Sequence, residues 1–153
     1  EGFFSSSLPL LANISYRLDR GLKFMGGNMD REKFANDPEA DGRELKNPLP
    51  RDKASMLRGQ KYYNTYCIVC HGPRGEGNGS VVPKFPMPPS LHSEKVRTWS
   101  DGRIYHVITA GQNLMPSYAS QINREDRWAI IHYVRALQRA LNPTESDLKE
   151  PGR

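Results

Sequence analysis

The chain has 153 residues and a net charge of +5, and 37% of its residues are apolar. Its length suits one domain with extensions, and its 13 Gly and 12 Pro residues indicate that much of it is loop or arm. No apolar run approaches the roughly 18 residues of a membrane-spanning helix, and no basic cluster is interleaved with stacking aromatics. The sequence therefore excludes a transmembrane helix and disfavours nucleic acid binding.

Residues 1–52 show neither a helical nor a strand period. A charged stretch over residues 30–44 would alone be typical of disorder, but large apolar side chains have little use in a solvated linker. We therefore predict an extended arm that docks on partner subunits, with a flexible linker from a membrane anchor as the alternative. The apolar side chains are Phe3, Phe4, Leu8, Leu10, Leu11, Ile14, Tyr16, Leu18, Leu22, Phe24, Met25 and Phe34.

The next stretch predicts a helix over residues 53–66, with Asp52 as its N-cap. One stripe of this helix holds Met56, Gly59, Tyr63 and Cys67. A glycine inside a helix costs about 1 kcal/mol relative to alanine. We therefore expect another helix to pass close to Gly59.

The only two cysteines are Cys67 and Cys70, and His71 follows directly. This C-x-x-C-H pattern is typical of covalent c-type haem attachment, since two thiols at this spacing can add to the two vinyl groups of one haem. A redox-active pair would need a thioredoxin-like βαβ setting, and zinc would need further Cys or His ligands at matching spacing. We predict one covalent haem c, with His71 as the proximal iron ligand.

Residues 72–91 form a Gly- and Pro-rich loop that is too long for an ordinary connector, and we expect it to wrap one face of the haem. A short helix is predicted over residues 101–110, between Ser100 and Gly111. Asn123 caps a last helix that ends near Leu141, before Pro143. Its apolar stripe, Ile130, Tyr133, Val134, Leu137 and Leu141, lies opposite Arg127, Arg135, Gln138 and Arg139. The tail, residues 142–153, is predicted to be exposed or bound to a partner.

The basic excess belongs to residues 53–141, which carry twelve Lys/Arg and five Asp/Glu. Two interpretations stay open. The cations could neutralise the haem propionates, or they could steer the protein toward an acidic redox partner.

The ligand on the other side of the iron decides what the haem can do. Met115 is the best candidate, because it follows the helix stop at Gly111 in an irregular stretch that Pro116 stiffens. His92, His106 and an open position are alternatives, and a Met in such a loop can also simply fill a gap.

Residues 53–141 resemble a class I cytochrome c. Gly59, Tyr63 and Cys67 fit the family's N-terminal helix at steps of four, and Ile130 with Tyr133 fits its C-terminal helix, which crosses at that glycine. The resemblance implies an all-α fold. The family also carries a Met-Pro ligand loop, which Met115-Pro116 matches, so the resemblance implies ligation by His71 and Met115.

In that family a proline carbonyl accepts a hydrogen bond from the proximal histidine, and Pro89 resembles this proline. Such a bond would fix the tautomer of His71. The cofactor-binding set that the resemblance implies is Cys67, Cys70, His71, Pro89, Trp99, Met115 and Tyr118, with His71 and Met115 as the iron ligands.

A narrower resemblance rests on residues 47–50, 84–91, 101–109, 115–118 and 126–130. These phrases are similar to the mono-haem cytochrome subunit of alternative complex III, a membrane quinol-oxidising assembly. The resemblance implies one-electron transfer with no bond-making chemistry of its own. Its expected partners are other subunits of a membrane respiratory complex, including a multi-haem cytochrome, and a downstream oxidase or soluble carrier.

Haem is attached outside the bacterial cytoplasmic membrane, so we expect a peripheral position on the periplasmic face. The chain opens at Glu1 without Met or an apolar signal core, which indicates a processed form and leaves open a lipid anchor upstream of Glu1. Two rival functions are a freely diffusing periplasmic shuttle and an open-site haem enzyme or gas sensor.

Overall fold

The computed structural model describes residues 37–149, so the predictions for residues 1–36 and 150–153 lie outside the described part. Within residues 37–149 the structure is helical and contains no strand, although an isolated bridge pairs Gln112 with Met115. The all-α prediction is confirmed for this part of the chain. The elements are α2 (Pro38–Glu44), α3 (Lys53–Tyr62), the π-helical turn η1 (Tyr63–Cys67), α4 (Ile68–His71), α5 (Glu94–Arg97), α6 (Asp101–Ala110), α7 (Arg124–Leu141) and α8 (Glu145–Lys149).

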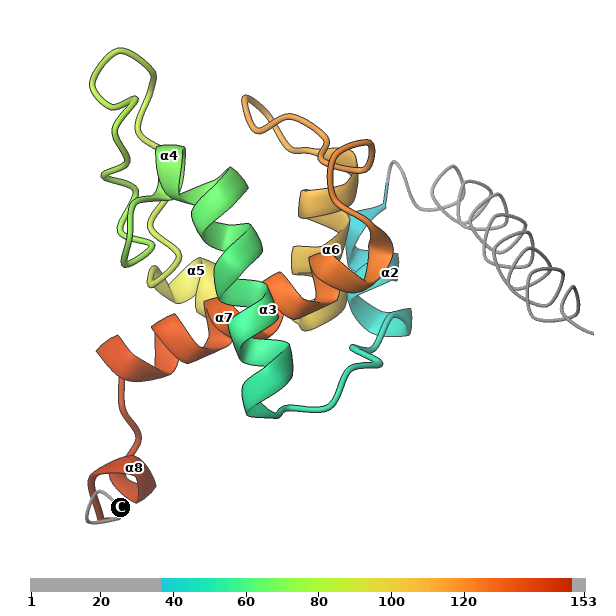
Figure 1. The fold of residues 1–153 in the computed structure, drawn as a ribbon, viewed down its shortest axis with the longest axis vertical. Helices are drawn as coiled ribbons and strands as arrows, with labels where there is room; N and C mark the ends of the chain where they lie inside the picture. Colours follow the sequence, from blue (N-terminus) through green and yellow to red (C-terminus); the bar gives the residue numbers. More distant parts are fainter. Residues whose placement is uncertain (1–36, 150–153) are drawn as a thin grey trace, which may run out of the picture. The chain divides into compact units, whose positions relative to one another are not determined.

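Helix α3 crosses α7 with Gly59 at the contact (Figure 1). A Cβ atom at Gly59 would overlap the carbonyl group of Ala129, which is fully buried. One turn after Gly59, at the start of η1, the Tyr63 ring meets the Tyr133 ring edge to face, with 5.2 Å between centroids. The close approach predicted from Gly59 is therefore confirmed.

Helix α7 begins where predicted, because the Asn123 side chain accepts a hydrogen bond from the backbone N–H of Asp126. The expected polar face of α7 is partly wrong. Arg127 and Gln138 are buried, since α7 is covered on more than one side: Arg127 donates to the Thr109 hydroxyl and Gln138 to the Leu91 carbonyl. Both polar side chains are therefore structural rather than solvated.

Residues 37–52 pack on the domain, so the compact unit begins at Asp37 and not at the predicted boundary of Lys53. Asp37 caps α2, and α2 lies along α6 (Figure 1). The Asn47 amide donates to the Trp128 carbonyl at 3.1 Å, and a His132 ring nitrogen lies 3.0 Å from the Leu49 carbonyl. Because these hydrogen bonds connect the segment to α7, residues 37–52 belong to the same compact unit as the helices. Docking of residues 1–36 on a partner stays a prediction.

The crossing gives a first test. Gly59→Val should lower the free energy of unfolding of the haem-loaded protein by about 1–3 kcal/mol, because the new side chain meets main chain that cannot move aside cheaply. Thermal unfolding followed by circular dichroism measures the effect. Lys61→Val, at an exposed position of the same helix, is the control for intrinsic helix propensity. Equal melting temperatures for the two variants would contradict the crossing.

Candidate haem site

The attachment motif lies at the junction of η1 and α4, where Cys67 ends the π-helical turn and Cys70 and His71 end the helix. Because residues three and four apart share a helix face, the two sulfur atoms and the imidazole project to one side. The Ile68 N–H donates to the Tyr63 carbonyl, five residues back, which gives η1 its wider turn. The motif is thus built on continuous helix.

Both cysteines are unpaired thiols, and Cys67 is buried. Burial, with Cys70 close by, raises the pKa of the Cys67 thiol to about 12. Disulfide exchange needs a thiolate, so this environment disfavours the redox-pair alternative. It is compatible with a sulfur atom that ends in a thioether bond to an apolar group.

The loop after the motif folds back along α4. Gly77 N–H donates to the His71 carbonyl at 2.8 Å, Gly79 N–H to the Cys70 carbonyl at 3.1 Å, and Val81 N–H to the Val69 carbonyl at 3.2 Å. These bonds satisfy carbonyls that a helix end otherwise leaves without partners. A Cβ atom at Gly79 would lie 2.6 Å from the Cys70 carbonyl carbon. The close approach therefore requires glycine there.

His71 is held as a ligand-competent imidazole. Burial lowers its pKa, which favours the neutral form that binds metals. Its Nδ1 atom is buried and has no hydrogen-bond partner within residues 37–149. The loop returns close by, since Leu91 N–H donates to the Gly75 carbonyl at 2.8 Å. Pro89 lies exposed in this returning segment, and its bond to His71 stays a prediction.

Met115 lies in a short turn that α6 holds at its C-terminal end. Gln112 and Met115 exchange two backbone hydrogen bonds of 2.9 Å. Tyr118 N–H donates to the Ile108 carbonyl at 3.0 Å, and the Ser117 hydroxyl donates to the Thr109 carbonyl at 2.5 Å. The last carbonyls of α6 therefore fix the turn that carries the Met115 side chain.

Most of the predicted cofactor-binding residues gather around one apolar core. Cys67 belongs to that core, and Trp99, Met115 and Tyr118 pack against it. Burial raises the pKa of the Tyr118 hydroxyl, with smaller effects from Cys67 and Cys70. Thiols, an imidazole with a free ring nitrogen, a thioether turn and apolar walls are a set that fits haem c.

The two alternative histidine ligands are already engaged. The Nε2 atom of His92 lies 2.6 Å from the Arg74 carbonyl, and the Nδ1 atom of His106 lies 2.5 Å from Asp41 Oδ2. Each contact occupies one ring nitrogen and leaves the other available, so these contacts alone exclude neither histidine. Ligation by Met115 stays a prediction.

Sequence reasoning missed two supports of the site. The Tyr63 hydroxyl donates to the Gly72 carbonyl at 2.8 Å and so fixes the residue that ends α4. Arg127 reaches the Thr109 hydroxyl at 2.5 Å, beside the Met115 turn. The aromatic stripe on α3 was a signal for Tyr63, whereas nothing local distinguishes Arg127 from a solvated arginine.

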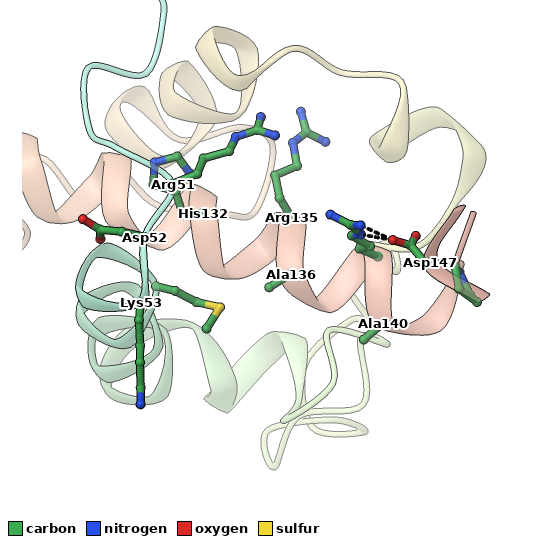
Figure 2. Close-up of a pocket in the computed structure, with 11 residues that line it drawn as sticks. Arg51, Asp52, Lys53, His132, Arg135, Ala136, Ala140 and Asp147 are labelled. Carbon is green, nitrogen blue, oxygen red and sulfur yellow. Dashed lines mark hydrogen bonds and ion pairs between the residues drawn. The ribbon is translucent and has the colours of Figure 1, made fainter. Parts of the chain in front are cut away.

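A separate pocket lies between the start of α3 and the C-terminal half of α7 (Figure 2). Asp147 of α8 pairs with Arg139 at its edge, and none of the predicted cofactor-binding residues lines it. Its lining residues are Arg51, Asp52, Lys53, Met56, His132, Arg135, Ala136, Arg139, Ala140, Pro143 and Asp147.

Two features are absent from the described residues. No group of three His, Cys, Asp or Glu side chains in this part of the chain could hold a metal ion. No helix in residues 37–149 is long and apolar enough to cross a bilayer.

Comparison with known proteins gives matches of three kinds. The family profile of cytochrome c oxidase, cbb3-type, subunit III matches residues 54–134. A thiosulfate dehydrogenase of Thiomonas intermedia (strain K12) is 28% identical over 146 residues, which are 91% of this chain and 41% of that protein. A chain of the reducing HAO-like protein complex of Kuenenia stuttgartiensis superposes with a TM-score of 0.52 at 29% identity, over 61% of this chain and 49% of that one. The chain thus spans less than half the length of each of these two relatives.

The matched region begins within α3 and ends within α7, so it contains the attachment motif, the Met115 turn and the helix crossing. The prediction of a class I cytochrome c fold is therefore confirmed. The chain belongs to the family of cbb3-type cytochrome c oxidase subunit III and is a c-type cytochrome, which binds haem c covalently and transfers electrons.

Proposed function

We propose that this chain carries a single haem c between His71 and Met115 and transfers one electron at a time as a subunit of a membrane quinol-oxidising complex. The observation that carries the ligand assignment is the turn holding Met115, which backbone hydrogen bonds attach to α6 beside the core that contains Cys67. The whole sequence has two cysteines, which is the number that one haem c uses.

The chain's own residues would hold the haem in a fixed, dry environment. The haem supplies the reversible one-electron couple. Cys67 and Cys70 hold it covalently, His71 offers a neutral imidazole, and the apolar core excludes water. Methionine as the second iron ligand would give a higher reduction potential than a second histidine, which would suit the exit side of a respiratory chain.

The assignment to a complex rests on sequence resemblance and on the apolar side chains of residues 1–36. Phrases such as residues 84–91 and 101–109 resemble the mono-haem subunit of alternative complex III. Residues 1–36 carry apolar side chains without a period of their own, and these are best buried on another protein. We accordingly propose a peripheral position on the periplasmic face, with multi-haem cytochrome subunits as donors and an oxidase or soluble carrier as acceptor.

A second candidate comes from the likeness to a thiosulfate dehydrogenase, which extends over 91% of this chain. The chain would then be the electron-transfer part of a thiosulfate-oxidising protein. The compound that reduces the haem distinguishes the two proposed functions. Membranes that contain the protein would reduce the haem with quinol in the first case, and thiosulfate would reduce it without quinol in the second.

The ligand assignment is tested by Met115→Ala. The oxidised protein should show the weak far-red charge-transfer band of Met-to-iron coordination, and the variant should lose it because the sulfur is gone. Met87→Ala is the control, since Met87 is 62% exposed in the loop after the attachment motif. If the band survives in Met115→Ala, another group is the ligand.

The complex assignment is tested by deleting residues 1–36. The haem domain should stay folded, because the compact unit begins at Asp37, but it should detach from its membrane complex. Quinol-driven haem reduction should then depend on the cytochrome concentration, since an intramolecular step becomes bimolecular. If the truncated protein stays bound and its haem is reduced at the rate of the full-length protein, residues 1–36 do not attach the domain to the complex. Concentration dependence in the full-length protein as well would favour the diffusing shuttle.

A further inference from the structure

We propose that α2 positions the haem site through a buried tie between Asp41 and His106, which holds α6 and with it the Met115 turn. Asp41 and His106 are positioning residues in this proposal, not ligands. The inference rests on the proposed ligation by His71 and Met115.

The tie itself is short and enclosed. Asp41 Oδ2 lies 2.5 Å from His106 Nδ1, and the two residues are only 5% and 6% exposed. The other carboxylate oxygen of Asp41 is buried without a hydrogen-bond partner within residues 37–149. The carboxylate therefore depends on His106 alone, and removing either partner leaves the other buried and unsatisfied.

Two more contacts run in parallel with this tie. Gly102 lies so close to α2 that a Cβ atom there would meet the carbonyl oxygens of Asp41 and Leu45. Arg103 forms an ion pair with Glu39. Its guanidinium also lies 4.4 Å from the centre of the Trp99 ring, one of the predicted cofactor-binding residues. Arg103 thus connects α2 to Trp99.

Helix α6 transmits its position to Met115. Ile108 and Thr109 hold the turn through their carbonyls, and a Cβ atom at Gly111 would lie 2.6 Å from the Met115 carbonyl oxygen. Ile104 and Ile108 belong to the same core as Cys67. A shift of α6 would therefore move the Met115 side chain together with Ile104 and Ile108.

The other side of α6 is held by α7. Arg135 Nε lies 2.8 Å from Asp101, and Tyr105 stacks on Trp128 with 4.1 Å between ring centroids. Helix α6 is thus held from two sides, by α2 and by α7. Removing the Asp41 tie releases one side and leaves the other, so the domain can stay folded while the ligand turn loses its fixed position. Ligand sites depend on positions held to a fraction of an ångström.

The test is competition for the iron by imidazole. Absorbance titrations use the full-length ferric holoprotein at a temperature where every variant is folded. Asp41→Ala should bind imidazole about tenfold more tightly, which is ~1.4 kcal/mol, because the Met115 turn competes less well. Asp41→Asn should stay near the wild-type affinity, since its amide oxygen can still accept a hydrogen bond from His106.

Two controls separate positioning from stability. Arg43→Ala removes an exposed charge on α2, and Asp52→Ala removes the N-cap of α3 and so lowers stability away from α6. Both should bind imidazole like the wild type. If Asp41→Ala melts earlier but binds imidazole no more tightly than Asp52→Ala, Asp41 is only structural and the proposal is overturned.

Two further variants cover the remaining outcomes. If Asp41→Ala yields no haem-loaded protein, Asp41→Leu replaces it. That variant fills the space with an apolar side chain that accepts no hydrogen bond from His106, and it should also tighten imidazole binding about tenfold; an unchanged affinity would overturn the proposal. Met115→Ala should bind imidazole most tightly. If its affinity equals that of the wild type, the ligand assignment fails, and this inference fails with it, whatever Asp41→Ala shows.

Discussion

The contact between Gly59 and the main chain at Ala129 is the constraint on which the rest of the domain depends. Because no side chain separates the two helices there, α3 and α7 can approach closely enough for Tyr63 to reach Tyr133. The attachment motif continues from α3 through η1 into α4, so the crossing sets the place of the cysteines relative to α7. Helix α7 in turn holds α6 through the stacked rings of Trp128 and Tyr105. The attachment motif and α6, which carries the Met115 turn at its end, are therefore connected through one crossing.

The sequence was informative where a signal is local. Asp52, Ser100 and Asn123 each cap a helix at the predicted position, since a capping side chain acts on backbone groups two or three residues away. The C-x-x-C-H motif and the Met-Pro pair are local in the same way. Gly59 was informative because a glycine on an apolar helical stripe destabilises the helix unless another backbone packs against it.

What the sequence did not predict depends on partners far along the chain. The boundary at Asp37 follows from bonds such as that between Asn47 and Trp128, 81 residues apart. Asp41 and His106 are 65 residues apart and belong to no periodic pattern. Arg127 is buried because it packs against α6, where its guanidinium donates to the Thr109 hydroxyl and lies 5.0 Å from the centre of the Tyr105 ring, whereas its residue type alone predicts exposure. Such contacts become visible only when the chain is folded.

The burial of Cys67 also bears on when haem can be attached. In the folded domain this thiol is 9% exposed, within a core formed by side chains of several helices. Its burial raises its pKa to about 12, so almost none of it is the reactive thiolate at neutral pH. The folded domain therefore presents this sulfur atom poorly to a vinyl group. Haem addition is expected to be easier before α3 and α7 pack together than afterwards.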